Sequence, residues 1–161
     1  MYEHALPDDP QRSWEQSYPG TPVQLRHVRR ALREFLGNCP PADDAVHLLS
    51  ELAANAVLHS DSGKTGGTFT ARARHVVNEY VHGEVEDQGS DWRGELLASA
   101  TRPHGLYLLL SLASACGIDR TGRAGLVWFR LDYPRRPSRA RQRPADALAA
   151  TALVTNRRTA P

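Results

Sequence analysis

The clearest pattern in the chain is a helical one over residues 21–36. Apolar residues recur at intervals of three and four, with arginines between them, as in a helix with one buried and one solvated face. The apolar positions are Leu25, Val28, Leu32, Phe35 and Leu36, and the arginines are Arg26, Arg29, Arg30 and Arg33. Thr21 and Pro22 are typical of a capped helix start, and Gly37 and Pro40 mark the end.

A second helix is predicted from about Asp43 to His59. Its apolar residues follow helical spacing, and the acidic residues at its start suit the positive end of the helix dipole. The expected core-facing residues are Ala45, Leu48, Leu49, Leu52 and Ala56. Glu51, Asn55 and His59 are spaced four apart and should form a polar ridge along the margin of that apolar stripe.

Alternating segments predict strands elsewhere. Between Tyr80 and Glu86, the residues Val81, Gly83 and Val85 alternate with polar ones, as in a strand with one covered face. The other expected strands are residues 12–18 at a sheet edge, 68–75, 117–120 and 125–131, the last two joined as a hairpin through residues 121–123. The apolar segment from Gly105 to Cys116 predicts a buried third helix.

This order of elements predicts the fold class and the domain limits. Most strands follow one another as hairpins and the helices can cover one face, which favours an α+β two-layer sandwich with a mixed, mostly antiparallel sheet and about three helices. We expect one domain at residues 21–133. Residues 1–20 form an N-terminal segment with the edge strand, and residues 134–161 form a tail that is predicted to be disordered.

The charge of the chain is unevenly distributed. Residues 134–161 contain seven arginines and one acid, whereas residues 1–133 contain 13 basic and 17 acidic side chains. The pI of about 8.7 therefore arises from the tail, and the body lacks the excess of positive charge that nucleic-acid binding requires. The tail is either a solvated arm or a segment that docks on an acidic partner.

Length and composition describe an ordinary globular protein. A chain of 161 residues can bury a sizeable core. No apolar run is long enough to span a bilayer, and the N-terminus has no signal-peptide pattern, so a cytoplasmic location is expected without a membrane partner. Cys39 and Cys116 are expected to be buried thiols rather than a disulfide or a metal pair.

Glu51 and Asn55 are the first candidate functional residues. Their spacing on an otherwise apolar helix makes the two side chains point the same way. A carboxylate in such surroundings usually has a partner, because burying an unpaired charge is costly. Glu51 is a candidate base, and the carbonyl of Asn55 suits Mg²⁺. The alternative is an amphipathic helix whose solvated edge carries both residues.

Two further segments carry candidate chemistry. Asp87 ends a strand and Gly89 follows it, so the acid can accept a hydrogen bond from an exocyclic amine while the glycine lets a ring approach the backbone. In residues 102–106, Gly105 opens an apolar helix after a polar loop, which offers free amides and a positive dipole to phosphates. Taken singly, each segment is also an ordinary turn or helix boundary.

Together these segments resemble the GHKL (Bergerat-fold) ATP-binding superfamily, and within it the bacterial anti-sigma-factor serine/threonine kinases and their actinobacterial relatives. Residues 51–56 (Glu-Leu-Ala-Ala-Asn-Ala) match the N box of that family, residues 85–89 the G1 box and residues 104–106 the G2 box. Residues 127–131 resemble its closing strand. The resemblance covers about residues 21–133.

The resemblance implies that ATP and Mg²⁺ bind between the helices and the loop of residues 88–105. Asn55 would hold Mg²⁺, Asp87 would accept the adenine amine, and Glu51 would orient or deprotonate a serine of a partner protein. Gly89 would let the base approach. The other expected nucleotide contacts are His104, Gly105 and Leu106. His59 either contacts the lid or substrate or has a capping or packing role at the end of the helix. Arg102 either neutralises phosphate charge or is solvated.

Pro103, Asp91 and Leu126 depart from the family pattern, which has glycines at the first two positions and often, at the third, a threonine that supports the acid of the G1 box. The leading interpretation is a Mg-ATP-binding regulator that phosphorylates an anti-sigma antagonist and can also sequester a sigma factor. The three departures favour a different interpretation, a partner-switching module that keeps the fold and has lost catalysis. A histidine-kinase catalytic domain and an α+β domain with coincidental motifs are also compatible with the sequence. A homodimer is implied by the resemblance, and no direct contact with nucleic acid is expected.

Overall fold

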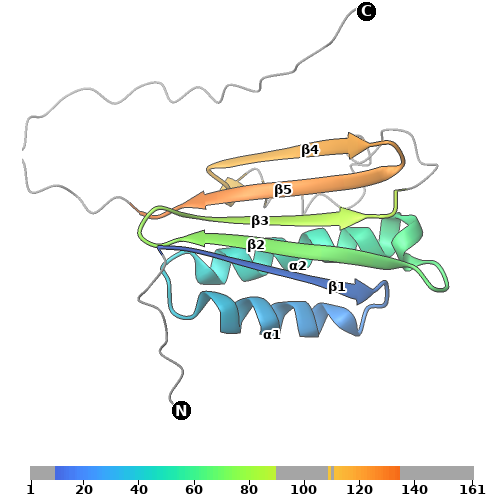
Figure 1. Cartoon of the computed structure of the whole chain (residues 1–161), viewed down its shortest axis with the longest axis horizontal. Coiled ribbons are helices and arrows are strands. Elements are labelled where there is room, and N and C mark those ends of the chain that lie inside the picture. Colours follow the sequence, from blue (N-terminus) through green and yellow to red (C-terminus); the bar gives the residue numbers. More distant parts are fainter. Residues whose placement is uncertain (1–9, 90–108, 110, 135–161) are drawn as a thin grey trace, which may run out of the picture.

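The computed structural model describes residues 10–89, 109 and 111–134, which form the predicted α+β two-layer sandwich. A five-stranded sheet has two helices packed on one of its faces (Figure 1). The elements are β1 (Gln11–Pro19), α1 (Gln24–Leu36), α2 (Ala42–His59), the 3₁₀ helix η1 (Asp61–Gly63), β2 (Thr68–Val76), β3 (Tyr80–Asp87), β4 (Ala115–Thr121) and β5 (Ala124–Asp132).

The strands are arranged in the order β1-β2-β3-β5-β4, and every neighbouring pair is antiparallel. The edge strand expected at residues 12–18 is present as β1, which pairs with β2 along its whole length. In β3, Val81, Gly83 and Val85 are buried while the residues between them are half-exposed. This alternation confirms that one face of the sheet is covered and the other is not.

The amphipathic pattern predicted for α1 is confirmed, but its start is not. Val28, Leu32 and Leu36 are buried beneath the helix. The helix begins at Gln24, and its cap residue, Val23, makes no side-chain capping bond. The backbone carbonyl of Thr21, rather than its hydroxyl, accepts from the Gln24 amide at 3.0 Å. A turn therefore precedes the helix where the sequence predicted a hydroxyl cap.

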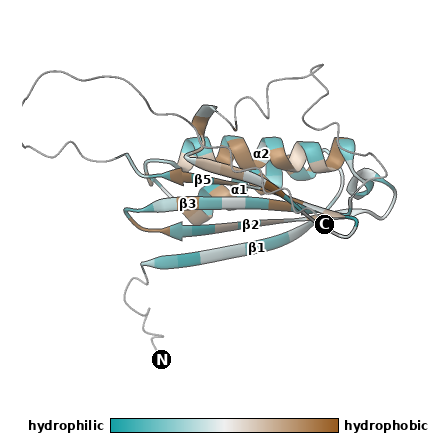
Figure 2. Cartoon of the chain, turned by 90° about the horizontal axis from the view of Figure 1, so that it is seen from above, coloured by the Kyte–Doolittle hydropathy of each residue, from teal (hydrophilic) through white to brown (hydrophobic). Residues whose placement is uncertain are grey.

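Helix α2 lies over the sheet as its apolar stripe predicts. All five expected core residues are buried to 5% exposure or less, and they belong to the same hydrophobic core as Phe69 and Phe129. Figure 2 shows hydrophobic colour along α2 and mostly hydrophilic colour along β1. None of the helices that the structure describes is long and apolar enough to cross a membrane.

The helix predicted from Gly105 to Cys116 ends earlier than its apolar pattern indicated. Leu109, Ser111 and Leu112 are helical, but Ala115 and Cys116 lie in β4, opposite Arg130 and Phe129 of β5. An apolar run suits a buried strand as well as a buried helix, so periodicity alone could not place this boundary. The predicted β4–β5 hairpin is present and turns through Gly122 and Arg123.

A buried polar cluster closes the end of the sheet where β1 begins. His75 is 3% exposed, its Nδ1 accepts from Arg12 at 3.3 Å, and its Nε2 lies 2.7 Å from the Tyr133 hydroxyl. Burial and the hydrogen-bonded thiol of Cys39 raise the pKa of Tyr133 to about 12. Both cysteines are free thiols, but they are half-buried rather than buried as predicted, and Cys116 lies on β4. The cluster fastens β1, β2 and the α1–α2 loop to the segment after β5.

Candidate functional site

Glu51 and Asn55 lie on α2, on its half-buried margin rather than in the core. Both side chains are partly exposed, and the preceding and following core residues of the helix hold its other face against the sheet. Within the described part of the chain, neither side chain makes a hydrogen bond or an ion pair. Two polar side chains with free hydrogen-bonding capacity therefore face the same way, one turn apart. His59 is exposed at the C-terminal end of α2.

Asp87 is the last residue of β3, and backbone amides fix its carboxylate. Its Oδ1 accepts from the Gly89 amide at 2.6 Å and from the Gly125 amide, on the neighbouring strand β5, at 3.2 Å. A Cβ added to Gly125 would come within 3.0 Å of that oxygen, so glycine leaves room for the acid. The other oxygen, Oδ2, makes no hydrogen bond to a described residue and can accept one from a ligand.

Gly89 adopts a backbone conformation that favours glycine, and it is tightly packed. Its φ is +77°, and an added Cβ would come within 1.6 Å of the carbonyl oxygen of Arg123 in the β4–β5 turn. Its own carbonyl accepts from the Asp61 amide at 2.6 Å. Gly89 thus joins the end of β3 to two neighbouring turns. Whether it also lets a base approach stays a prediction.

The loop after α2 supports Asp87 in a way that the sequence did not reveal. Ser62 is fully buried, and its hydroxyl accepts from the amide of Gln88 at 3.0 Å. Added Cβ atoms at Gly20 and Gly67 would collide with the Ser62 carbonyl. The glycines of residues 63–67 indicate a loop in the sequence, but they do not reveal that this loop supports Asp87.

Asp61 adds charge to this loop. It forms ion pairs with Lys64 at 2.7 Å and with Arg123 at 3.4 Å. The hydrogen bond from Lys64, and then the charges of Lys64 and Arg123, lower the pKa of its carboxyl despite some desolvation. Asp61 is therefore ionised at neutral pH, and it ties the β4–β5 turn to the loop that follows α2.

The topology brings the two halves of the candidate site to the same end of the molecule. In Figure 1 the C-terminal end of α2 and the C-terminal end of β3 lie at the same end of the sheet, and α2 packs against β3. Asn55, one turn from the end of α2, is therefore closer to the level of Asp87 than Glu51 is. His104, Gly105 and Leu106 lie outside the described residues, as do Asp91, Arg102 and Pro103.

The strand register corrects the role expected of Leu126. Leu126 pairs with Glu86, whereas Gly125 pairs with Asp87. Because side chains alternate between faces, Leu126 points to the uncovered face, away from the carboxylate of Asp87. Leu126 therefore does not replace a supporting residue beside that acid, and it no longer counts as a departure that weakens the site.

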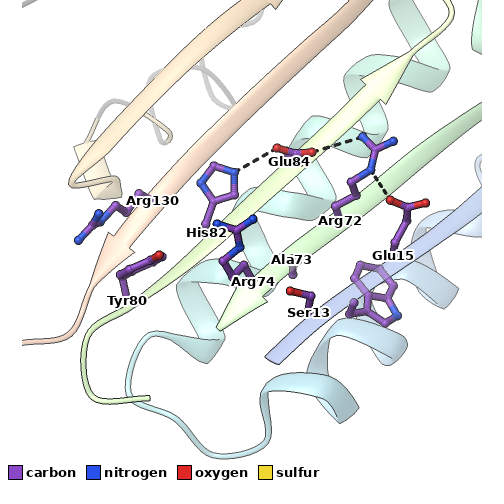
Figure 3. A pocket seen from close by; sticks show the side chains of 10 residues that line it. Ser13, Glu15, Arg72, Ala73, Arg74, Tyr80, His82, Glu84 and Arg130 are labelled. Atoms are coloured by element: carbon purple, nitrogen blue, oxygen red, sulfur yellow. Dashed lines mark hydrogen bonds and ion pairs between the residues drawn. The ribbon is translucent and has the colours of Figure 1, made fainter. Parts of the chain in front are cut away.

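A hollow of about 450 Å³ lies on the uncovered face of the sheet (Figure 3). Its central cation, Arg72, is paired with Glu15, Glu84 and Glu86 at 2.5, 3.3 and 2.8 Å. Figure 3 shows His82 turned toward Glu84 from the other side. These charges satisfy one another, and α2 covers the opposite face, so the hollow is separate from the Glu51, Asn55 and Asp87 site.

Comparison with known proteins establishes the fold. The chain is similar in structure to the crystal structure of the RsbU and RsbW domains of Rv1364c from Mycobacterium tuberculosis, with a TM-score of 0.59 and 22% sequence identity. The match covers 78% of this chain and 33% of that one, so the chain spans about a third of its length. No family model matches, and neither does any curated protein sequence. The chain thus shares the fold of the part of that structure which it matches.

Proposed function

We propose that the protein is a Mg-ATP-binding regulator of the anti-sigma-factor kinase type, which phosphorylates a serine or threonine of a partner protein. The observation that carries this proposal is the fixed carboxylate of Asp87. Two backbone amides hold it at the end of β3, where α2 also ends, and its other oxygen is not engaged by any described residue. A carboxylate held in this way can accept a hydrogen bond from an adenine amine without reorganising.

The other described residues fit the same ligand. Asn55 offers a carbonyl oxygen that no described residue engages, which is a ligand type that Mg²⁺ accepts. When bound, Mg²⁺ would neutralise charge on the phosphates during transfer. Glu51 has no partner among the described residues and is one turn from Asn55, so it can orient or deprotonate a hydroxyl that approaches the terminal phosphate. His104, Gly105 and Leu106 remain the proposed phosphate contacts.

The expected partners are proteins. The similarity to a structure that contains an RsbW domain supports a partner-switching, kinase-like role, with an anti-sigma antagonist as the phosphorylated protein and a sigma factor as a second partner. A cytoplasmic location and a homodimer are part of the same proposal. Because the likeness is at 22% identity, the activity is argued from the residues of this chain.

Calorimetric titration with ATP, with and without Mg²⁺, tests the nucleotide claim. Wild-type protein should bind Mg-ATP, and Asn55→Ala should lose the metal-dependent part of the affinity, roughly tenfold. Asn38→Ala, an exposed asparagine in the loop after α1, is the matched control and should bind as wild type. Absence of binding heat, together with no thermal stabilisation by Mg-ATP, rejects the proposal.

A transfer assay separates this proposal from a second candidate function, a module that binds partners without catalysis. Pro103 and Asp91 favour this second candidate, because proline removes a backbone donor and an acid near the nucleotide repels phosphate. Labelled ATP is incubated with the protein and an antagonist protein. Glu51→Gln should reduce transfer by about 10²-fold or more while it preserves nucleotide affinity, and Glu34→Gln on α1 should change neither. Nucleotide binding without transfer by wild-type protein supports the module instead.

A further inference from the structure

The exposed side of α1 carries arginines that the proposed nucleotide site does not use. Arg26, Arg29, Arg30 and Arg33 are all exposed, whereas Val28, Leu32 and Leu36 of the same helix are buried. Their spacing places the points where the four side chains leave the helix within about 100° of its circumference and along about 10 Å of its axis. We refer to these four residues as the arginine strip.

Most of the arginine strip has no carboxylate partner among the residues that the structure describes. Arg33 pairs with Asp43 across the α1–α2 loop. Arg29 donates to the carbonyl oxygen of Leu25 at 3.3 Å, and a guanidinium nitrogen of Arg30 lies 3.4 Å from a ring nitrogen of His27. In the part of the chain that the structure describes, three of the four cations therefore have no opposite charge to neutralise them.

The arginine strip also opposes the stability of its own helix. Arg26 and Arg30 are four residues apart, as are Arg29 and Arg33, and like charges at that spacing destabilise a helix. Arg26 lies in the first turn, which contains no acidic residue and where the helix dipole disfavours a cation. Glu34, the acid of α1, forms no ion pair with the strip among the described residues, whereas a negatively charged surface docked on the strip would offset these repulsions.

We propose that the arginine strip is a docking surface for a carboxylate-rich surface of a partner protein. Val23, which is 48% exposed, is three residues before Arg26 and seven before Arg30, so an apolar side chain continues the strip. Arginine next to exposed apolar surface is typical of protein interfaces. The planar guanidinium also binds carboxylates through two parallel hydrogen bonds, which gives directional recognition.

A protein fits this surface better than a nucleic acid or a membrane does. A strip of about 10 Å can contact few phosphates, and phosphate-driven binding needs many cations. Residues 1–133 contain more acidic than basic side chains, so an extended polyanion would be repelled beyond the strip. The docking surface rests on the proposed function in one respect, since it locates the protein partner of that function on a helix packed against α2.

The test is an NMR titration of the ¹⁵N-labelled full chain, at physiological salt, with a synthetic helical peptide that has glutamates on one face and leucines on the other. Amide shifts are expected at residues 23–33. The double variant Arg26→Gln/Arg30→Gln should weaken peptide binding roughly tenfold or more. A double variant with the same charge change elsewhere, Arg74→Gln on the uncovered sheet face with Arg135→Gln in the tail, should bind as wild type.

Several outcomes overturn the docking surface: no shifts at millimolar peptide, shifts confined to residues 134–161, or equal weakening in both double variants. So does tighter binding, through residues 26–33, of a DNA duplex of about 20 base pairs or of phosphatidylglycerol vesicles. Mg-ATP titration of the double variants keeps the two proposals distinct. Wild-type protein that binds Mg-ATP but not the peptide rejects the docking surface alone, and wild-type protein that binds the peptide but not Mg-ATP rejects only the nucleotide function. The Arg26→Gln/Arg30→Gln variant should lose peptide binding and keep normal ATP binding.

Discussion

At the scale of single residues, Asp87 shows why a short motif can identify a site and still leave its supports hidden. The acid and the glycine two residues after it were visible in the sequence. Their hydrogen bonds involve Gly125 and Asp61, which are distant in the chain and have no distinctive local pattern. Because the register of β3 with β5 determines which residue faces Asp87, the role of Leu126 could not be judged from sequence alone.

Gly89→Ala should destabilise the protein far more than Gly66→Ala. Both glycines have a positive φ, +77° and +78°, but only Gly89 has a backbone carbonyl in the space a Cβ would occupy. We expect a loss of about 1 kcal/mol for Gly66→Ala from backbone conformation alone, and about 3 kcal/mol or more for Gly89→Ala. Urea unfolding measures both. Equal losses would show that Gly89 is not packed against the β4–β5 turn.

His75 should make the protein less stable in mild acid. Burial, and then the neighbouring Arg12 charge, lower the pKa of His75 below its ordinary value of 6.5. The unfolded chain therefore binds this proton at a higher pH than the folded protein does, so the contribution of His75 to stability is complete above pH 6.5 and declines as the pH falls toward the folded pKa.

The measurement is the free energy of unfolding in urea, from about pH 5 to 8. His75→Gln should remove this part of the pH dependence, so that the difference between wild type and variant shrinks as the pH falls. A difference that grows toward acid pH would mean that the folded protein holds the His75 proton more tightly, contrary to the geometry of the cluster.

At the scale of secondary structure, the helices and the β2–β3 hairpin could be predicted because one periodicity dominates each of them. α2 begins at Ala42 rather than Asp43 and ends at His59 as predicted. The predicted end of the helix before β4 was wrong because a continuous apolar run fits both a helix and a strand. The predicted start of α1 was wrong because backbone hydrogen bonds of a turn replaced the expected hydroxyl cap. Such backbone bonds leave no side-chain pattern in the sequence.

Two leucines of α2 test whether this helix is held by its apolar stripe. Leu49 is fully buried and Leu58 is 63% exposed. Leu49→Ala should cost about 2–5 kcal/mol of unfolding free energy, because it removes buried apolar surface and leaves a cavity. Leu58→Ala should change stability by less than about 0.5 kcal/mol. Similar losses for the two variants in denaturant titrations would contradict the observed orientation of the helix.

At the scale of the whole molecule, the antiparallel sheet and its helical layer bring the C-terminal end of α2 and the end of β3 to one end of the domain. The opposite face carries a separate, self-neutralised ion network. The fold class followed from the order of predicted elements. The placement of the site depends on long-range packing around Ser62 and Gly89, which no local pattern encodes.

The most direct test of the nucleotide site is an amide NMR map of the full chain with Mg-ATP. We predict the largest shift changes at Gly89 and Gly125, whose amides bond the Asp87 carboxylate, and along α2 near Asn55. Asp87→Asn should abolish these changes, while Arg74→Gln on the uncovered face should preserve them. Shift changes confined to the uncovered face around Arg72 and His82, or none at saturating nucleotide, would contradict the account.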